Sequence, residues 1–347
     1  MNRIFITGMG RSGTTLIDKL LTNHKDIELL TQPFPLIFTF LKSKFLEKYN
    51  RHEYYVLNGN ACKDEYSIDK FNLFLSEYKL NFKEIISVFD QMKTYSGQMT
   101  KINIELTSNS SYSFLELYDL IIKQNLINHN VKYIGSKEII CEEFIPFLLQ
   151  NNTKVILVIR DPRDVVASIN YPTKTKYFGD KKPLLFILRN WRRSIDYLQC
   201  FENKSNFMYI RYEDLVCDTF KSLDNITNFL DLTSFDHNQF DNGILDRYGK
   251  VWKSNTSYEQ GTSFISSSSI GAYKKVLTQD EINYIETICY KEMQLLNYTL
   301  DTKPNSDIIQ NYKDTNVKST KYLDKNYTST IDNINQEIKR YIQYANK

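Results

Sequence analysis

The sequence predicts an α/β fold in which a central parallel sheet is covered by helices on both faces. Four short apolar runs have the length of buried strands: Arg3–Thr7, Val131–Gly135, Lys154–Ile159 and Phe207–Arg211. Continuous apolar runs, rather than alternating ones, are typical of strands that are buried on both faces, and such strands belong to parallel sheets. Helical periodicity fills the segments between them, and this alternation of strand and helix indicates the fold class.

Weaker patterns complete the expected order of elements. Two further strands are predicted at Glu28–Thr31 and Lys101–Leu106. Apolar residues with helical spacing predict helices over the following segments: Thr14–Asn23, Phe114–Ile127, Leu184–Phe201, Phe220–Leu230 and Thr278–Leu296. The last of these opens with a capping-box pattern, in which Thr278 is followed three residues later by Glu281.

Composition divides the chain into one large domain and a tail. We expect a single domain over residues 1–300, with residues 35–100 as a helical insertion. Residues 301–347 form a polar extension, in which an amphipathic helix is expected at 330–345. That helix is expected either to dock on the domain or to form the surface of a homodimer.

Charge, cysteine and histidine content narrow the function. The 347 residues carry 44 Lys+Arg and 41 Asp+Glu, and a net charge of +3 argues against a nucleic-acid-coating protein. The five cysteines form no CxxC pair and the four histidines are scattered, so we expect a reducing compartment and no metal site. No apolar run approaches the roughly 20 residues of a membrane span, and a cytoplasmic location is expected.

The first chemical motif is the segment Gly8-Met9-Gly10-Arg11-Ser12-Gly13-Thr14-Thr15. It follows a predicted strand and opens a predicted helix, which is the context of a phosphate-binding loop in a P-loop-containing nucleotide-binding fold. Thr14 stands where the lysine of GxxxxGK[ST] would contact the β- and γ-phosphates of ATP, and Arg11 is the cation of the loop. The loop therefore suits a 5′-phosphoryl group of a nucleotide other than ATP.

The second motif is Val155–Ile169, in which a buried strand ends at Arg160 and a helix begins after it. The carboxyl end of such a strand is where open α/β sheets bind ligands. Ser168 lies eight residues after Arg160, so a guanidinium and a hydroxyl are available to a second phosphate. The neighbouring charged residues Asp161, Arg163 and Asp164 are expected to form a surface network.

These motifs, with the later segment Arg211–Leu215 (RYEDL), resemble the sulfotransferases that use 3′-phosphoadenosine 5′-phosphosulfate (PAPS). The similarity covers roughly residues 3–300 and is greatest to the bacterial and the tyrosylprotein and carbohydrate branches. It implies that Gly10 and the loop Arg11-Ser12-Gly13-Thr14-Thr15 hold the 5′-phosphosulfate. It also implies that Arg160 and Ser168 hold the 3′-phosphate.

The resemblance implies three further contacts. Tyr212 falls where the family often contacts adenine, with a core tyrosine as the alternative. The segment Ser269–Lys275 resembles the late loop that closes over the nucleotide, with Gly271, Tyr273 and Lys274 as contacts, although Ala272 replaces a common arginine. Lys137, at the end of a predicted strand, matches the lysine near the bridging oxygen, with a solvated surface lysine as the alternative.

The reaction implied by the resemblance is transfer of a sulfuryl group from PAPS to a hydroxyl or amine, leaving adenosine 3′,5′-bisphosphate (PAP). Arg11, Lys137 and the loop N–H groups would stabilise the departing phosphate, and no metal is implied because the chain supplies the cations. The family positions for the general base hold Gln32 and Ile139, neither of which accepts a proton at useful strength. The remaining candidates are Glu138, then Glu105, with His24 expected at the surface.

The acceptor is expected to be a glycan or a small molecule, bound between the 35–100 insertion and the polar loop at 171–183. Two other functions stay open on the sequence. A P-loop small-molecule kinase would prefer Mg-ATP, which the missing lysine disfavours. A non-catalytic PAP-binding protein would retain the loop without a general base.

Overall fold

The structure is a computed structural model that describes residues 1–49, 66–93, 99–172, 181–254, 263–314 and 330–345. The cysteine at position 62 and the centre of the expected 171–183 loop lie outside these ranges. The base of that loop is described, because the side-chain amide of Asn170 donates to and accepts from the backbone of Lys182, each at 2.9 Å.

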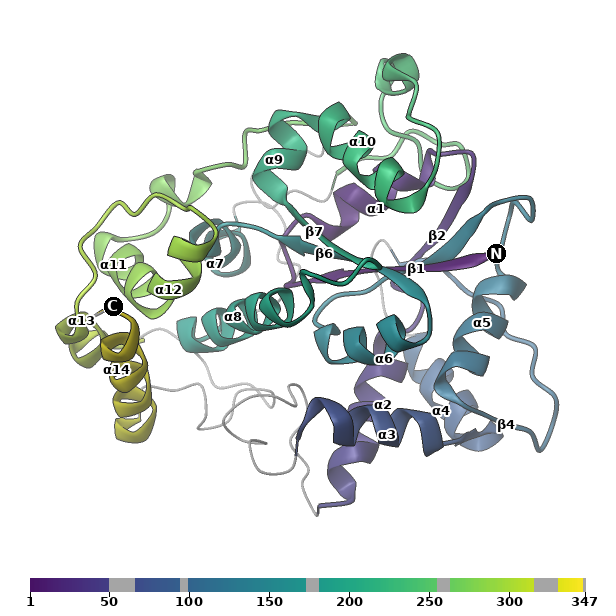
Figure 1. Cartoon of the computed structure of the whole chain (residues 1–347), viewed down its shortest axis with the longest axis horizontal. Helices are drawn as coiled ribbons and strands as arrows, with labels where there is room; N and C mark the ends of the chain where they lie inside the picture. The colour runs from purple at the N-terminus through teal and green to yellow at the C-terminus, as the bar shows by residue number, and fades with distance from the viewer. Residues whose placement is uncertain (50–65, 94–98, 173–180, 255–262, 315–329, 346–347) are drawn as a thin grey trace.

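A five-stranded parallel sheet forms the centre of the molecule, in the order β2-β5-β1-β6-β7 (Figure 1). Its strands are β1 (Asn2–Gly8), β2 (Ile27–Thr31), β5 (Tyr133–Lys137), β6 (Thr153–Ile159) and β7 (Phe207–Arg211). All carboxyl ends therefore meet at one edge, where ligands bind in sheets of this kind. Five of the six predicted strands are confirmed, although β5 begins and ends two residues later than its apolar run.

The strand predicted at Lys101–Leu106 is wrong. Its side chains alternate between exposed and half-buried, as in a strand, but the backbone pairs with side chains at the end of the helix α5 (Phe114–Gln124). Glu105 N donates to Gln124 Oε1 at 3.1 Å, and Asn103 N donates to Asn125 Oδ1 at 2.8 Å. The carbonyls of Glu105 and Asn103 accept from the same two amides, so this segment needs no neighbouring strand.

Helices cover both faces of the sheet, which confirms the predicted fold class (Figure 1). The upper face in this view carries α1 (Thr14–Thr22), α9 (Tyr212–Cys217) and α10 (Thr219–Leu230). The lower face carries α2 (Pro35–Glu47), α3 (Ile68–Glu77), α4 (Phe82–Met92), α5 (Phe114–Gln124), α6 (Ile145–Gln150) and α8 (Leu184–Phe201). A separate antiparallel pair, β3 (Leu80–Asn81) with β4 (Ser111–Tyr112), joins two segments of this lower layer.

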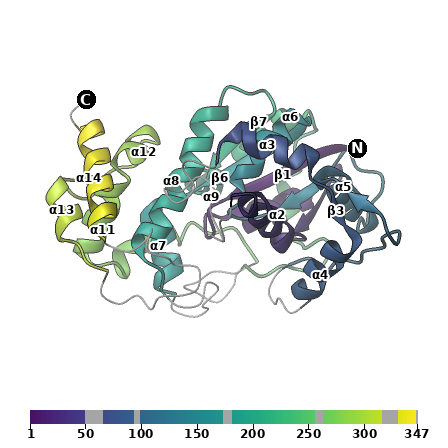
Figure 2. The ribbon, with the colours of Figure 1, turned by 90° about the horizontal axis from the view of Figure 1, so that it is seen from below.

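Helices also lie beyond the carboxyl edge of the sheet. They are α7 (Pro162–Asn170), α11 (Gln279–Ile288), α12 (Tyr290–Leu295), α13 (Ser306–Asn311) and α14 (Ile331–Ala345). Figure 2 shows α11–α14 as one group beside α7 and α8. The single helix predicted over Thr278–Leu296 is divided at Cys289 into α11 and α12. None of the described helices is long and apolar enough to cross a membrane.

The helix expected at 330–345 is present as α14 and is docked on the rest of the chain. Glu337 is buried and accepts from Arg189 Nε at 2.8 Å and from Arg192 NH1 at 2.6 Å, both on α8. Ile334 and Ile338 pack against the core. An apolar stripe and a paired buried carboxylate together fix the tail to the domain.

Candidate functional site

The segment between β1 and α1 has the backbone of an anion-binding loop. Arg11 and Gly13 both adopt left-handed conformations, with φ of 71° and 93°. Left-handed residues within a short turn direct successive N–H groups toward one concave side. Thr14 then begins α1, whose first N–H groups have no partner within the helix. The predicted loop thus lies at the carboxyl edge of the sheet and has a backbone that suits an anion.

Gly13 is required for a second reason, which is the closeness of Tyr212. A Cβ atom at Gly13 would lie 2.4 Å from Cδ2 of the Tyr212 ring. The same ring also contacts Arg160, whose guanidinium carbon lies 4.5 Å from the ring centroid. Tyr212 therefore lies in contact with both the phosphate loop and the Arg160 guanidinium.

Arg160 connects the phosphate loop to the late loop. It follows β6 and is 5% exposed. Its NH1 donates to Arg11 O at 3.1 Å and its NH2 donates to Ser269 O at 2.5 Å. The third nitrogen, Nε, is buried without a hydrogen-bond partner among the described residues. A buried guanidinium that is held by carbonyls and keeps an unused donor is suited to an incoming anion.

Ser168 lies beside Arg11, as a shared phosphate site requires. Arg11 Nε donates to Ser168 Oγ at 2.9 Å, although the two residues are 157 positions apart in the sequence. Ser12 is also buried here, and its Oγ has no hydrogen-bond partner within the described part of the chain. Gly10 is buried within the same loop. The structure therefore gathers the residues predicted for the two phosphates into one place.

The expectation of a surface charge network at 161–164 is wrong, because these side chains are buried. Arg163 NH2 pairs with Asp161 at 2.7 Å and its NH1 pairs with Glu286 of α11 at 2.5 Å. Asp164 lies 3.7 Å from Arg160 NH2. Charges buried at this depth are retained where their partners fix neighbouring elements, and here they join α7 to α11.

Asp164 also anchors the late loop. Its two carboxylate oxygens accept from Gly271 N at 2.9 Å and from Tyr273 N at 3.0 Å. Tyr273 is buried and its hydroxyl donates to Asp301 at 2.6 Å, whereas Lys274 is exposed and lies 3.4 Å from the same carboxylate. The sequence placed Gly271, Tyr273 and Lys274 together, but it predicted a surface charge and not this loop contact for Asp164.

Lys137 is a buried lysine beside the phosphate loop. It is 1% exposed, and its Nζ donates to Thr15 Oγ1 at 3.2 Å and to Gln32 Oε1 at 3.0 Å. Burial is the main cause that lowers the pKa of Lys137 to about 8, and the nearby cations Arg11 and Lys19 also lower it. The alternative of a solvated surface lysine is therefore wrong.

Glu138 points to the opposite face of the sheet, because consecutive residues at the end of a strand alternate. Its Oε1 accepts from Phe34 N at 3.0 Å, and Phe34 is the residue that precedes α2. Burial raises the pKa of this carboxyl to about 8, which is within the range of a general acid or base near neutral pH. The carboxyl also stabilises the start of α2.

The other two candidate bases lie elsewhere. Glu105 is exposed and lies against the end of α5, which precedes β5 and therefore adjoins the amino edge of the sheet. His24 follows α1 and is buried, not at the surface, with its Nε2 2.9 Å from Thr233 O. The structure does not bring Glu105 or His24 together with the phosphate loop.

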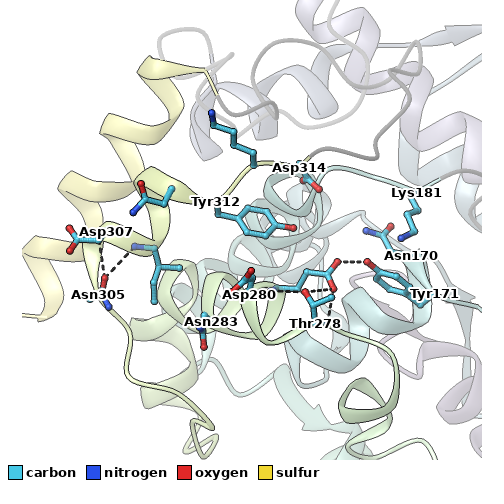
Figure 3. Close-up of a pocket in the computed structure, with 14 residues that line it drawn as sticks. Asn170, Tyr171, Lys181, Thr278, Asp280, Asn283, Asn305, Asp307, Tyr312 and Asp314 are labelled. Carbon is cyan, nitrogen blue, oxygen red and sulfur yellow. Dashed lines mark hydrogen bonds between the residues drawn. The ribbon is translucent and has the colours of Figure 1, made fainter.

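A polar cavity of about 570 Å³ lies beyond the end of α7, between α11 and α13 (Figure 3). Tyr171, Glu281 and Asp314 are among its lining residues, and none of the phosphate-loop residues is. Glu281 caps α11 through Thr278 N at 2.8 Å and accepts from the Tyr171 hydroxyl. Asp314 Oδ2 accepts from Leu184 N at 2.6 Å. These groups thus stabilise helix ends around the cavity.

Across the described ranges, no group of three or more His, Cys, Asp or Glu side chains could hold a metal ion.

Comparisons with known proteins identify the family of this chain. The model of the sulfotransferase domain family matches residues 1–297. No curated protein matches the chain. Similar solved structures include the sulfotransferase domain from the curacin biosynthetic pathway, with 17% identity over 86% of this chain and 98% of that chain and a TM-score of 0.48. Mouse sulfotransferase SULT7A1 complexed with PAP has 14% identity, coverage of 84% and 85%, and a TM-score of 0.42.

Proposed function

Since the chain belongs to the sulfotransferase family and is a PAPS-dependent sulfotransferase, we propose that its acceptor is a hydroxyl or amine of a glycan or small molecule. Arg160, Arg11 and Ser168 are joined by hydrogen bonds at the carboxyl edge of the sheet. This observation supports the assignment of the donor site to these residues. Bound PAPS supplies the activated sulfuryl group.

The donor is proposed to lie across the phosphate loop and α7. The N–H groups of residues 10–15 and the first turn of α1 would hold its 5′-phosphosulfate. Arg160 and Ser168 would hold its 3′-phosphate, with Tyr212 beside the base and the late loop over it. The unused donors Arg160 Nε and Ser12 Oγ fit a ligand rich in acceptor oxygens.

Positive charge near the leaving oxygen is proposed to come from Lys137 and Arg11. Transfer of an anionic group between oxygens depends on alignment and on fixed cations more than on covalent chemistry by the protein. Lys137 is held in place by Thr15 and Gln32, so its ammonium is ordered before the donor binds. An ordered cation costs no reorganisation during transfer.

Glu138 remains the proposed general base for the acceptor. Its raised pKa suits proton transfer, and its contact with Phe34 places it at the start of the 35–100 insertion, where we expect the acceptor. Gln32 is proposed to orient the acceptor through its amide. We further propose a cytoplasmic location and a homodimer, both from the sequence.

The test is calorimetric titration of the full chain with PAP, beside ADP and Mg-ATP. Preference for PAP should fall about 10- to 150-fold in Arg160→Ala, because a hydrogen bond to a charged group contributes about 1.5–3 kcal/mol. Arg211→Ala is the matched control, since Arg211 also ends a strand and stacks on a tyrosine, at 4.5 Å from Tyr298. Indifference to the 3′-phosphate, or preference for Mg-ATP, would contradict the donor site and favour the kinase. PAP binding without turnover of any acceptor would favour the non-catalytic protein.

A further inference from the structure

Three buried polar side chains lie below the phosphate loop, between α1 and the end of β2. The Thr31 hydroxyl donates to Asp18 Oδ2 at 2.6 Å, and Lys19 Nζ donates to Thr31 Oγ1 at 2.6 Å. Lys19 Nζ is also 3.2 Å from Asp18 Oδ2. Asp18 is completely buried, and its Oδ1 has no hydrogen-bond partner among the described residues. A buried charge with an unused acceptor is costly, so its retention calls for a reason.

Lys137 is the immediate neighbour of this group. In the β2–β5 pairing, Thr31 is the register partner of Lys137, so their side chains leave the sheet on the same side. Lys137 Nζ bonds to Thr15, which lies one turn before Asp18 and Lys19 on α1. Strand register and helix periodicity therefore place the two sets of contacts next to each other.

Lys137 lies near other cations on the α1 side of the sheet, and a carboxylate there would offset their charge. Arg11 and Lys19 are both cations, and each lowers the pKa of Lys137. Its two hydrogen-bond partners are neutral. Two carboxylates act in the opposite direction, Asp18 and Glu138. Glu138 lies on the far face, so the α1 side has Asp18 as its compensating charge.

We propose that Asp18, fixed by Thr31 and Lys19, is a positioning residue that keeps Lys137 protonated and directed at the phosphate loop. The neutral amide of Gln32 contacts the Lys137 ammonium but carries no charge. Asp18, on α1, supplies the negative charge. The inference rests on the proposed role of Lys137 in sulfuryl transfer. It adds a residue that touches neither donor nor acceptor.

The test compares Asp18→Asn with Lys19→Met, two buried changes of opposite charge. The first readout is the titration of Lys137 in the free, full-length protein by ¹³Cε NMR of labelled lysines, with the signal assigned by its loss in Lys137→Met. Asp18→Asn should lower the Lys137 pKa and Lys19→Met should raise it, each by on the order of one unit. The second readout is the pH profile of PAPS hydrolysis, whose inflection should move in the same directions.

A merely structural role for these residues would destabilise both variants without moving the Lys137 pKa in opposite directions. Unchanged titration in both variants overturns the proposal. If Asp18→Asn does not fold, Thr31→Val decides in its place, because it removes the hydroxyl that fixes Asp18: a lower Lys137 pKa supports the proposal and no change refutes it. Failure of the sulfotransferase assignment would appear separately, as absent PAP binding with intact opposite shifts of the Lys137 pKa.

Discussion

Adding one methyl group at Gly13 is expected to weaken both the fold and donor binding. The new Cβ of Gly13→Ala would lie 2.4 Å from Cδ2 of Tyr212, about an ångström closer than an ordinary carbon contact. The backbone cannot relax freely, because φ of 93° is in the left-handed region. Tyr212 must therefore move, and it would leave the guanidinium of Arg160 on which it stacks.

The loss of unfolding free energy expected for Gly13→Ala has two parts. A left-handed conformation costs a residue with a Cβ about 1–2 kcal/mol relative to glycine. Overpacking against a buried ring costs about 1–3 kcal/mol more. Gly13→Ala should therefore lower the free energy of unfolding by about 2–5 kcal/mol.

The chain offers a control for each part. Gly249 has φ of 75° but no heavy atom within 4 Å of an added Cβ, so Gly249→Ala should show the backbone cost alone. The double variant Gly13→Ala/Tyr212→Ala removes the clash and should recover the overpacking cost relative to the sum of the single variants. Urea denaturation gives the free energies of unfolding, and calorimetry with PAP gives the loss of affinity.

Three results would refute this reasoning. Equal destabilisation by Gly13→Ala and Gly249→Ala would mean that the Tyr212 contact has no energetic weight. Additive effects in the double variant would mean the same. Full PAP affinity in Gly13→Ala would show that the stack on Arg160 is not part of the donor site.

Three further predictions follow from buried carboxylates. Glu138 has a pKa raised from 4.5 to about 8, so the folded chain should lose stability as pH rises from about 4.5 to 8, and Glu138→Gln should flatten that slope in urea melts. Glu337 is buried, yet Arg192 and Arg189 lower its pKa to about 2, so its contribution to stability is present above pH 4.5 and lost toward pH 2. Glu337→Gln should cost about 3–5 kcal/mol at pH 7, as unpairing a buried charge does, and PAP affinity should not change. Asp164→Asn keeps one acceptor oxygen and releases either Gly271 N or Tyr273 N, so calorimetry should show PAP affinity about tenfold lower. Unchanged affinity would mean that the late loop does not contribute to donor binding.

The sheet was predictable from the sequence because its strands are buried on both faces. Continuous apolar runs such as Lys154–Ile159 have no other simple explanation between helical segments. The segment Lys101–Leu106 failed because an alternating pattern reports only which side chains are half-buried. It does not report that Gln124 and Asn125 satisfy the backbone in place of a strand.

The phosphate loop was equally visible, since glycines at fixed positions between a strand and a helix have few other uses. The roles of Asp164 and Asp18 were not. Asp18-Lys19 stands as a charged pair within an otherwise apolar run in the first helix, which was the available signal. The role of this charged pair depends on which strand end packs against the first helix, and the sequence does not give that contact.

The sequence by itself therefore determined the fold class and the motifs that we propose for the donor site, because both follow from short, local sequence patterns. The tertiary structure decided which charges are buried and which of them meet. Arg11 reaches Ser168, and Asp18 lies beside the register partner of Lys137. Such contacts join residues far apart in the chain, and their energies depend on burial and distance, which no local pattern encodes.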